Sequence, residues 1–136
     1  MVIDSSALLA IVFGESDSDL YANAIETSLE SGGSLRLPAS VLVEAHIAAE
    51  SRKGEYGKRL AALIDGIQPD IIPLTVAVAN RAIVAFRSFG KGVHKAGLNF
   101  GDCMSYATAK DLKEPLLFKG RDFSHTDVRS VLPKLL

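Results

Sequence analysis

The chain has 136 residues, a length typical of one domain that buries a hydrophobic core without a disulfide or a structural metal. Hydrophobic residues make up 48% and charged residues 23% of it, close to the globular average, which argues against a disordered, coiled-coil or fibrous protein. The formal net charge of −1 lacks the basic excess of many nucleic-acid-binding proteins, so any contact with nucleic acid would depend on local patches.

The start of the chain has neither the basic residues of a secretory signal nor an apolar run long enough to span a membrane. Its longest apolar run covers residues 7–13, and an acid stands at position 4. The single cysteine, Cys103, excludes an internal disulfide and fits a reducing compartment. These features predict a cytoplasmic protein without a membrane segment.

Two strands and two helices are predicted in the first third of the chain. Residues 1–3 form a short apolar strand that ends at Asp4, and two serines lead into a helix over residues 7–13. A second helix over residues 16–31 has apolar residues at helical spacing and stops at two glycines. Residues 35–37 form the second strand.

A helical hairpin and a third strand follow. Ser40 is a start signal for a helix over residues 41–52, because a serine hydroxyl can accept an N–H of the first turn. Glu44 therefore lies about one turn into this helix. Residues 57–67 form the second helix of the hairpin, and residues 70–74 form the third strand.

In the last third of the chain, helices and a strand again follow one another. Thr75 caps a helix that ends before a glycine-rich, basic loop. Asn99 caps the next helix, residues 100–112, which places Asp102 in its first turn. Residues 115–118 form the last strand, and the remaining segment is rich in turn residues.

This alternation of short apolar strands with helices predicts an α/β fold. Parallel strands need helical crossovers, so the sheet should be short, largely parallel and covered on both faces, as in an α/β/α sandwich. No linker, repeat or low-complexity segment interrupts the pattern. We therefore expect one domain over residues 1–136.

Four acids stand where strands end or where the following helices begin. Asp4 follows the first strand, Glu44 lies in the helix entered after the second, Asp102 opens a helix, and Asp122 follows the last strand. In open parallel sheets, ligands bind outside the carboxyl ends of the strands. We expect these four side chains to converge there.

Four carboxylates in one place repel each other unless a cation neutralises them. Mg²⁺ prefers oxygen ligands, and the chain offers no cysteine and histidine set at zinc spacing. Such an ion can lower the pKa of a bound water and neutralise charge on a phosphodiester, so the pattern predicts hydrolysis of nucleic acid. The pattern does not fix the number of ions.

Taken singly, three of these acids also have a purely structural interpretation. Asp4 could be a helix cap, Asp102 a favourable charge in a first turn, and Asp122 a turn residue. Glu44 is harder to explain in this way, because nearly all its neighbours in the helix are apolar and a buried unpaired carboxylate is costly.

Four segments carry a resemblance to a known family: MVIDSSALLA, SVLVEA, NFGDCMSYATA and PLLFKGRDFSHTDV. In this order, over essentially the whole chain, the sequence resembles PIN-domain proteins and, more narrowly, the VapC-type toxins of bacterial toxin–antitoxin pairs. The resemblance implies an α/β/α fold, RNA cleavage with Mg²⁺ or Mn²⁺, a homodimer, and a cognate antitoxin that occupies the active site in a hetero-oligomer.

The resemblance also implies roles for the four acids, all as catalytic residues. Asp4 and Asp102 match the principal metal ligands, and Glu44 matches a ligand or the group that orients the attacking water. Asp122 would complete the acidic pocket. Some relatives have asparagine or an acid where Arg121 stands, so Asp127 is the alternative to Asp122.

Two basic segments are candidates for contact with RNA phosphates. Lys91, His94 and Lys95 lie in the loop before Asp102, and a second basic cluster surrounds the helical hairpin: Arg52, Lys53, Lys58 and Arg59. For either segment, an ordinary solvated surface is the competing interpretation. Cys103 fits a small buried hydrophobic residue better than a nucleophile.

Three competing functions make different demands on the sequence. A PIN nuclease for RNA maturation or decay would share the whole site but lack an antitoxin. A receiver-like signalling module would need a phosphoacceptor aspartate at the end of a central strand, whereas Asp70 begins its strand. A haloacid-dehalogenase-like phosphatase would need an acid where Ser6 stands.

Overall fold

Four parallel strands form the sheet in the computed structural model, which describes residues 1–134. Their order is β3-β2-β1-β4, and Val2 of β1 pairs with Arg36 on one side and with Leu116 on the other. The bounds are β1 Val2–Ile3, β2 Arg36–Pro38, β3 Asp70–Ile72 and β4 Leu116–Leu117. The last two residues of the predicted domain, 135 and 136, lie outside the described part.

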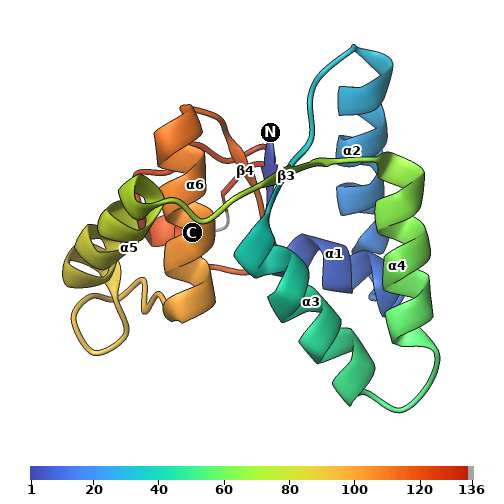
Figure 1. Ribbon diagram of the computed structural model, residues 1–136, viewed down its shortest axis with the longest axis horizontal. Helices are drawn as coiled ribbons and strands as arrows, with labels where there is room; N and C mark the ends of the chain where they lie inside the picture. Colours follow the sequence, from blue (N-terminus) through green and yellow to red (C-terminus); the bar gives the residue numbers. More distant parts are fainter. Residues whose placement is uncertain (135–136) are drawn as a thin grey trace.

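Helices cover the sheet on both faces, as predicted (Figure 1). Helices α1 to α4 lie on one side of the sheet, and α5 and α6 lie on the other. The α/β/α architecture is therefore confirmed. The bounds are α1 Ser5–Val12, α2 Ser18–Glu30, α3 Ala39–Ser51, α4 Tyr56–Ile67, α5 Val76–Phe89 and α6 Phe100–Leu112, followed by a 3₁₀ helix, η1, at Asp122–His125.

The core is divided between the two faces by the alternation of side chains along each strand. Val2 and Leu116 pack with α5 and α6, whereas their sequence neighbours Ile3 and Leu117 pack with α1 to α4. All four side chains are fully buried, and burying each of them contributes about 1.5–3 kcal/mol. Because both faces are covered, the strands contain consecutive apolar residues.

The predicted helix caps were partly right. Thr75 accepts the N–H of Val78 at 3.2 Å, and Asn99 caps α6 as expected. The predicted start of the first helix was wrong, because Asp4 itself is the cap of α1 and the helix begins at Ser5. Ser40 does not cap α3, which begins one residue earlier, directly after the proline that ends β2.

The order of the strands places a crevice beside Asp4. From β1 the chain moves to β2 on one side of the sheet, and it returns to β4 on the other side. Such a reversal separates the loops after the two strands and leaves a binding crevice at their carboxyl ends. Within residues 1–134, no helix is both long and apolar enough to cross a membrane.

Candidate active site

Asp4 lies at the carboxyl end of β1 with only 2% of its surface exposed. Its Oδ2 accepts the hydroxyl of Ser6 at 2.6 Å and the Ser6 backbone N–H at 3.1 Å. Its Oδ1 accepts the hydroxyl of Ser105, which is itself fully buried on α6. Three donors therefore compensate the buried carboxylate for lost hydration and fix its orientation.

Glu44 faces this carboxylate from α3. Its Oε1 accepts the hydroxyl of Ser5 at 2.5 Å, which joins the starts of α1 and α3. Burial raises the pKa of Glu44, and the charge of Asp4 raises it further, against the lowering effect of the hydrogen bond from Ser5. Glu44 is therefore a carboxylate with increased affinity for a proton.

Gly101 lets α6 approach Glu44 directly. A Cβ atom at position 101 would lie only 1.8 Å from Oε2 of Glu44 and 2.7 Å from its Cδ. No side chain fits in this space, so the glycine brings the first turn of α6, with its acid at position 102, against α3. This role of Gly101 could not be predicted from the sequence, because its backbone is an ordinary helical one and only the tertiary contact requires a glycine.

Asp102 both starts α6 and joins the acidic group. Its Oδ2 accepts the backbone N–H of Asn99 at 3.0 Å, and the Asn99 side chain accepts the Asp102 N–H at 2.9 Å. Burial raises the pKa of Asp102 to about 7, with further contributions from the charges of Asp4, Asp122 and Glu44. The structure thus brings all four predicted acids together.

Asp122, and not Asp127, is the fourth member of this group. Asp122 is exposed at the start of η1, close enough for its charge to act on Asp102. Asp127 instead accepts the Tyr106 hydroxyl at 2.5 Å and the Lys110 ammonium at 2.9 Å. The hydrogen bond from Tyr106 is the main reason why the pKa of Asp127 is lowered. The alternative to Asp122 is therefore occupied elsewhere.

Lys119 holds the segment that carries Asp122. Its backbone N–H donates to the Ser6 hydroxyl at 3.0 Å, the same hydroxyl that donates to Asp4. Its ammonium contacts Glu15 and Asp17, the latter at 2.8 Å, and both contacts raise the pKa of the lysine. Lys119 and Ser105 both lie in segments that carry the family resemblance, but their anchoring roles could not be predicted, because their partners are about 100 residues away in the sequence.

The predicted RNA-contact residues lie in the loop between α5 and α6. Lys91 and Lys95 are exposed, and the loop leads directly into the first turn of α6. The ring of His94 is instead engaged locally, where it accepts the backbone N–H of Ala96 at 3.1 Å and packs edge-on against Phe89. The two lysines are thus better placed than His94 to meet a phosphate.

The donor set fits a hard divalent cation held partly by water. The side chains that are hydrogen-bonded within the acidic group offer carboxylate and hydroxyl oxygens, and Mg²⁺ prefers oxygen ligands. Within the described residues, no three acidic, histidine or cysteine side chains form a metal-binding group by themselves. Mg²⁺ commonly binds through one or two carboxylates and keeps several waters, so Asp4 and Asp102 would suffice as direct ligands.

The raised pKa of Asp102 predicts a pH dependence of stability. The folded metal-free protein holds a proton on Asp102 up to about pH 7, whereas the unfolded chain releases it near pH 4. The free energy of unfolding should therefore fall as the pH rises from about 4 to 7. Thermal unfolding in chelator at a series of pH values tests this.

Two further measurements assign the effect to Asp102. In the Asp102→Asn variant, the free energy of unfolding should fall less steeply with pH. The fall that remains is due to Glu44, whose pKa is also raised. Mg²⁺ should restore the unfolding temperature of the wild type at pH 8. An identical pH profile for the variant and the wild type would contradict the assignment.

Comparisons with known proteins support one family. The PIN domain family model matches residues 1–129. Ribonuclease VapC30 of Mycobacterium tuberculosis is 41% identical over 133 residues, which cover 96% of this chain and 98% of that protein. Ribonuclease VapC28 of the same species is 41% identical over 136 residues, with 98% and 99% covered.

Solved structures agree on the fold. The M. tuberculosis VapC20 structure, described as a sarcin–ricin loop cleaving toxin, has a TM-score of 0.74 at 17% identity and covers 97% of this chain and 98% of its own. VapBC2 from Rickettsia felis, bound to a promoter DNA fragment, has a TM-score of 0.75 at 11% identity, with 95% and 94% covered. Matched in sequence and in fold over nearly its whole length, the chain belongs to the PIN-domain family, within its group of VapC ribonucleases.

Proposed function

We propose that this protein is a Mg²⁺-dependent endoribonuclease that hydrolyses RNA phosphodiester bonds and acts as the toxin of a toxin–antitoxin pair. The observation that carries the proposal is the convergence of Asp4, Glu44, Asp102 and Asp122 at the carboxyl ends of β1 and β4. The relatives named VapC ribonucleases, at 41% identity, support the same substrate class.

Each acid has a separate task in this proposal. Asp4, locked by Ser6 and Ser105, and Asp102 hold the cation, for which Mn²⁺ is the alternative to Mg²⁺. When bound, the cation supplies positive charge that neutralises the phosphate and the leaving oxygen. Asp122, exposed on η1, completes the anionic pocket and would act through water.

Glu44 is the group we assign to the attacking water. Its Oε1 is held by Ser5, whereas Oε2 points toward Gly101 at the start of α6, between α3 and the segment that carries Asp102. The raised pKa of Glu44 suits a carboxylate that accepts a proton from water at Oε2. A carboxylate with its ordinary pKa would be a weaker base.

In this proposal, the RNA substrate and the antitoxin partner bind at the same acidic site. Lys91 and Lys95, just before α6, would bind RNA phosphates beside the acids. A cognate antitoxin would occupy the site in a hetero-oligomer, as suggested by VapBC2 and by a toxin–antitoxin complex from Klebsiella pneumoniae, with a TM-score of 0.65 at 16% identity. Such a toxin would act in the cytoplasm, where its RNA is found.

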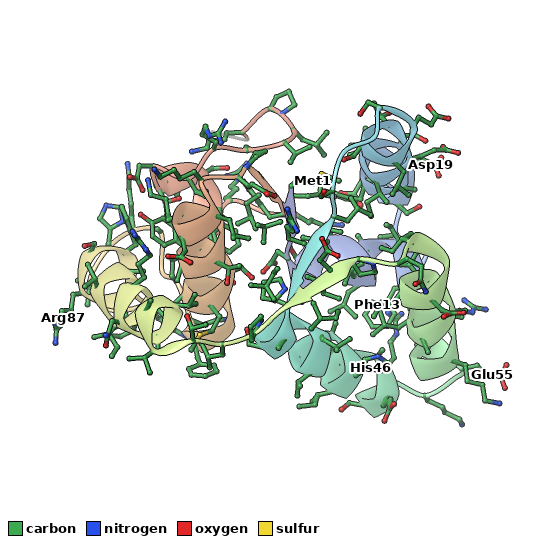
Figure 2. The ribbon with its side chains drawn as sticks, turned by 45° about the horizontal axis from the view of Figure 1, so that its top comes forward. Met1, Phe13, Asp19, His46, Glu55 and Arg87 are labelled. Atoms are coloured by element: carbon green, nitrogen blue, oxygen red, sulfur yellow. The ribbon has the colours of Figure 1, made fainter. Side chains whose placement is uncertain are left out.

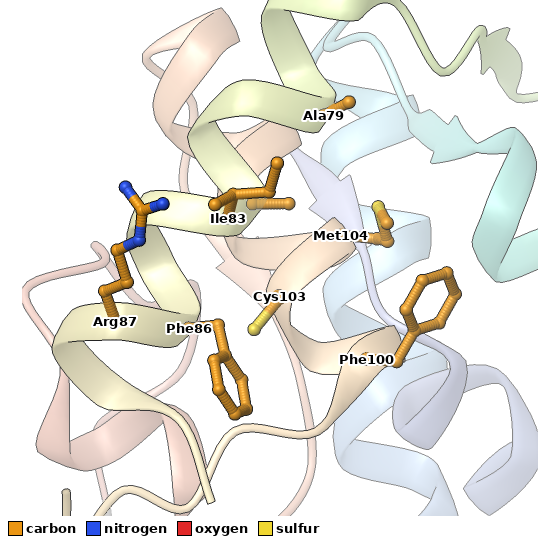
Figure 3. A pocket seen from close by; sticks show the side chains of 8 residues that line it. Ala79, Ile83, Phe86, Arg87, Phe100, Cys103 and Met104 are labelled. Carbon is orange, nitrogen blue, oxygen red and sulfur yellow. The ribbon is translucent and has the colours of Figure 1, made fainter. Parts of the chain in front are cut away.

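A homodimer is supported by an exposed apolar groove between α5 and α6 (Figure 3). The groove measures about 510 Å³, and Ile83 and Phe86 of α5 face Cys103 and Met104 of α6 across it. Phe100 at its rim is 74% exposed, which is unusual for an aromatic side chain. A second copy would bury this surface, and the mass of the protein in solution gives a direct check.

The competing functions differ in their predictions. A PIN nuclease of RNA maturation or decay would have the same site but no antitoxin. A receiver-like module is disfavoured because Asp70 begins β3 and is paired with Arg36 at 2.5 Å. Asp70 therefore lies at the amino end of its strand, whereas Asp4 lies at the carboxyl end of β1. A haloacid-dehalogenase-like phosphatase is also disfavoured, because it would need an acid at position 6, where a serine donates a hydrogen bond to Asp4.

Expression in a bacterial host tests the toxin role. We expect the wild-type chain to arrest growth, and we expect co-expression of the small protein encoded beside its gene to relieve the arrest. An Asp102→Asn chain expressed to the same level is the control and should not arrest growth. Growth without arrest at several expression levels, with RNA cleavage retained in vitro, would favour the maturation or decay function.

A further inference from the structure

The hairpin formed by α3 and α4 carries two arginines that the acidic site does not use: Arg52, directly after α3, and Arg59, in the first turn of α4. We propose that this hairpin binds the phosphate backbone of single-stranded RNA through Arg52 and Arg59, and so extends the RNA site away from the carboxylates. The proposal rests on the proposed ribonuclease function. It assigns a role to the basic cluster for which a solvated surface was the competing interpretation.

Aromatic rings hold the two arginines in place. The guanidinium carbon of Arg52 lies 4.3 Å from the centre of the Phe13 ring and 5.0 Å from that of Tyr56. The guanidinium carbon of Arg59 lies 5.3 Å from the Tyr56 ring, and the two rings pack edge to face at 5.0 Å. Side chains ordered in this way lose less conformational freedom when they bind a phosphate.

The hairpin is connected to the active site by two helices that run side by side. Helix α1 begins beside the carboxylates, where the Ser5 hydroxyl donates a hydrogen bond to Glu44 of α3. Both helices end at the aromatic cluster, where Arg52 lies over the Phe13 ring. Figure 2 shows Phe13 beside this hairpin, with Glu55 at its tip. Eight residues of helix span about 12 Å, which is the length of a few stacked nucleotides at about 3.4 Å each.

The charges of the two arginines are available for a ligand. Several other cations are paired with carboxylates, as Arg36 is with Asp70, Arg81 with Asp111 and Lys119 with Asp17. Over the described residues, neither hairpin arginine makes an ion pair with a protein carboxylate. A chain with a net charge of −1 and an acidic active site needs such local positive charge to hold RNA.

The experiment measures binding without cleavage. In the Asp102→Asn background, fluorescence anisotropy gives the affinity for a labelled single-stranded RNA of about 20 nucleotides over a range of salt concentrations. The Arg52→Gln/Arg59→Gln variant should bind about 10-fold more weakly near 0.1 M salt. The slope of log K against log salt should shrink by about 1.4, since each lost phosphate contact removes about 0.7.

A matched control removes the same charge elsewhere. The Arg81→Gln/Lys113→Gln variant changes two exposed cations near the far end of α6, away from the carboxylates, and should retain both the affinity and the slope. Arg52→Lys retains the charge without the planar group, and its affinity for RNA should lie between those of the wild type and the double variant. If the double-variant protein unfolds, Arg59→Gln alone replaces it, because Arg59 is exposed and lies over one ring, that of Tyr56.

Three outcomes are decisive. Equal affinity and slope for the hairpin and control variants would overturn the proposal, while cleavage by the wild type would leave the ribonuclease function intact. Polyglutamate that binds as tightly as RNA, with the same loss in the hairpin variant, would assign the surface to an acidic protein instead. If the hairpin variant loses more affinity for the 20-nucleotide RNA than for a tetranucleotide, the proposal is supported, because the shorter strand cannot reach both the carboxylates and the hairpin arginines.

Discussion

Asp102→Asn and Asp4→Asn proteins are expected to lose RNA cleavage by at least about 100-fold, the range typical for removing one electrostatic group from a catalytic site. The amide has the shape of the carboxylate but carries no charge to hold a divalent cation. Labelled RNA incubated with each protein and Mg²⁺ gives the rates. A chelator added to the wild type should abolish cleavage, and Mg²⁺ should restore it.

Asp127→Asn is the matched control for this change. It makes the same substitution at a carboxylate that accepts hydrogen bonds from Tyr106 and Lys110 and lies outside the acidic group. The variant protein should therefore cleave RNA like the wild type. Calorimetric titration with Mg²⁺ should show weaker binding only for the two active-site variants. Wild-type cleavage by Asp102→Asn protein, with its fold intact, would refute the metal assignment.

Gly101→Ala is expected to have an effect of similar size although it removes no functional group. The new methyl group would lie 1.8 Å from Oε2 of Glu44, so either Glu44 or the first turn of α6 must move. A swing of Glu44 would break its hydrogen bond to Ser5, and a shift of α6 would displace Asp102. A displacement of about 1 Å can lower a rate by about 100-fold.

Gly66→Ala on α4 separates this clash from the general effect of replacing a helical glycine. Apart from its chain neighbours and the backbone of its own helix, no atom of the described residues lies within 4 Å of the added methyl group at position 66, so cleavage should be retained. Stability should rise by up to about 1 kcal/mol, because alanine restricts the unfolded chain. Steady-state cleavage rates and denaturant unfolding of both variants give the comparison. Gly101→Ala protein with the wild-type rate would show that Glu44 need not stay in place.

The amino-acid sequence by itself determined the architecture and the position of the acids. Apolar strands alternating with capped helices admit few folds, and the caps at Thr75 and Asn99 depend only on neighbouring residues. Acids that follow parallel strands share one edge whatever the details of packing. The convergence of Asp4, Glu44, Asp102 and Asp122 was therefore predictable, although their catalytic roles stay predictions.

Only the tertiary structure decided what holds these acids in place. Ser105 and Asp4 are 101 residues apart, and nothing in the local sequence shows that their side chains meet. The need for glycine at position 101 arises only where α6 contacts α3. The choice of Asp122 over Asp127 depended on which of them met Tyr106 and Lys110. Hydroxyls, glycines and turn acids have no periodic pattern, so packing alone selects their partners.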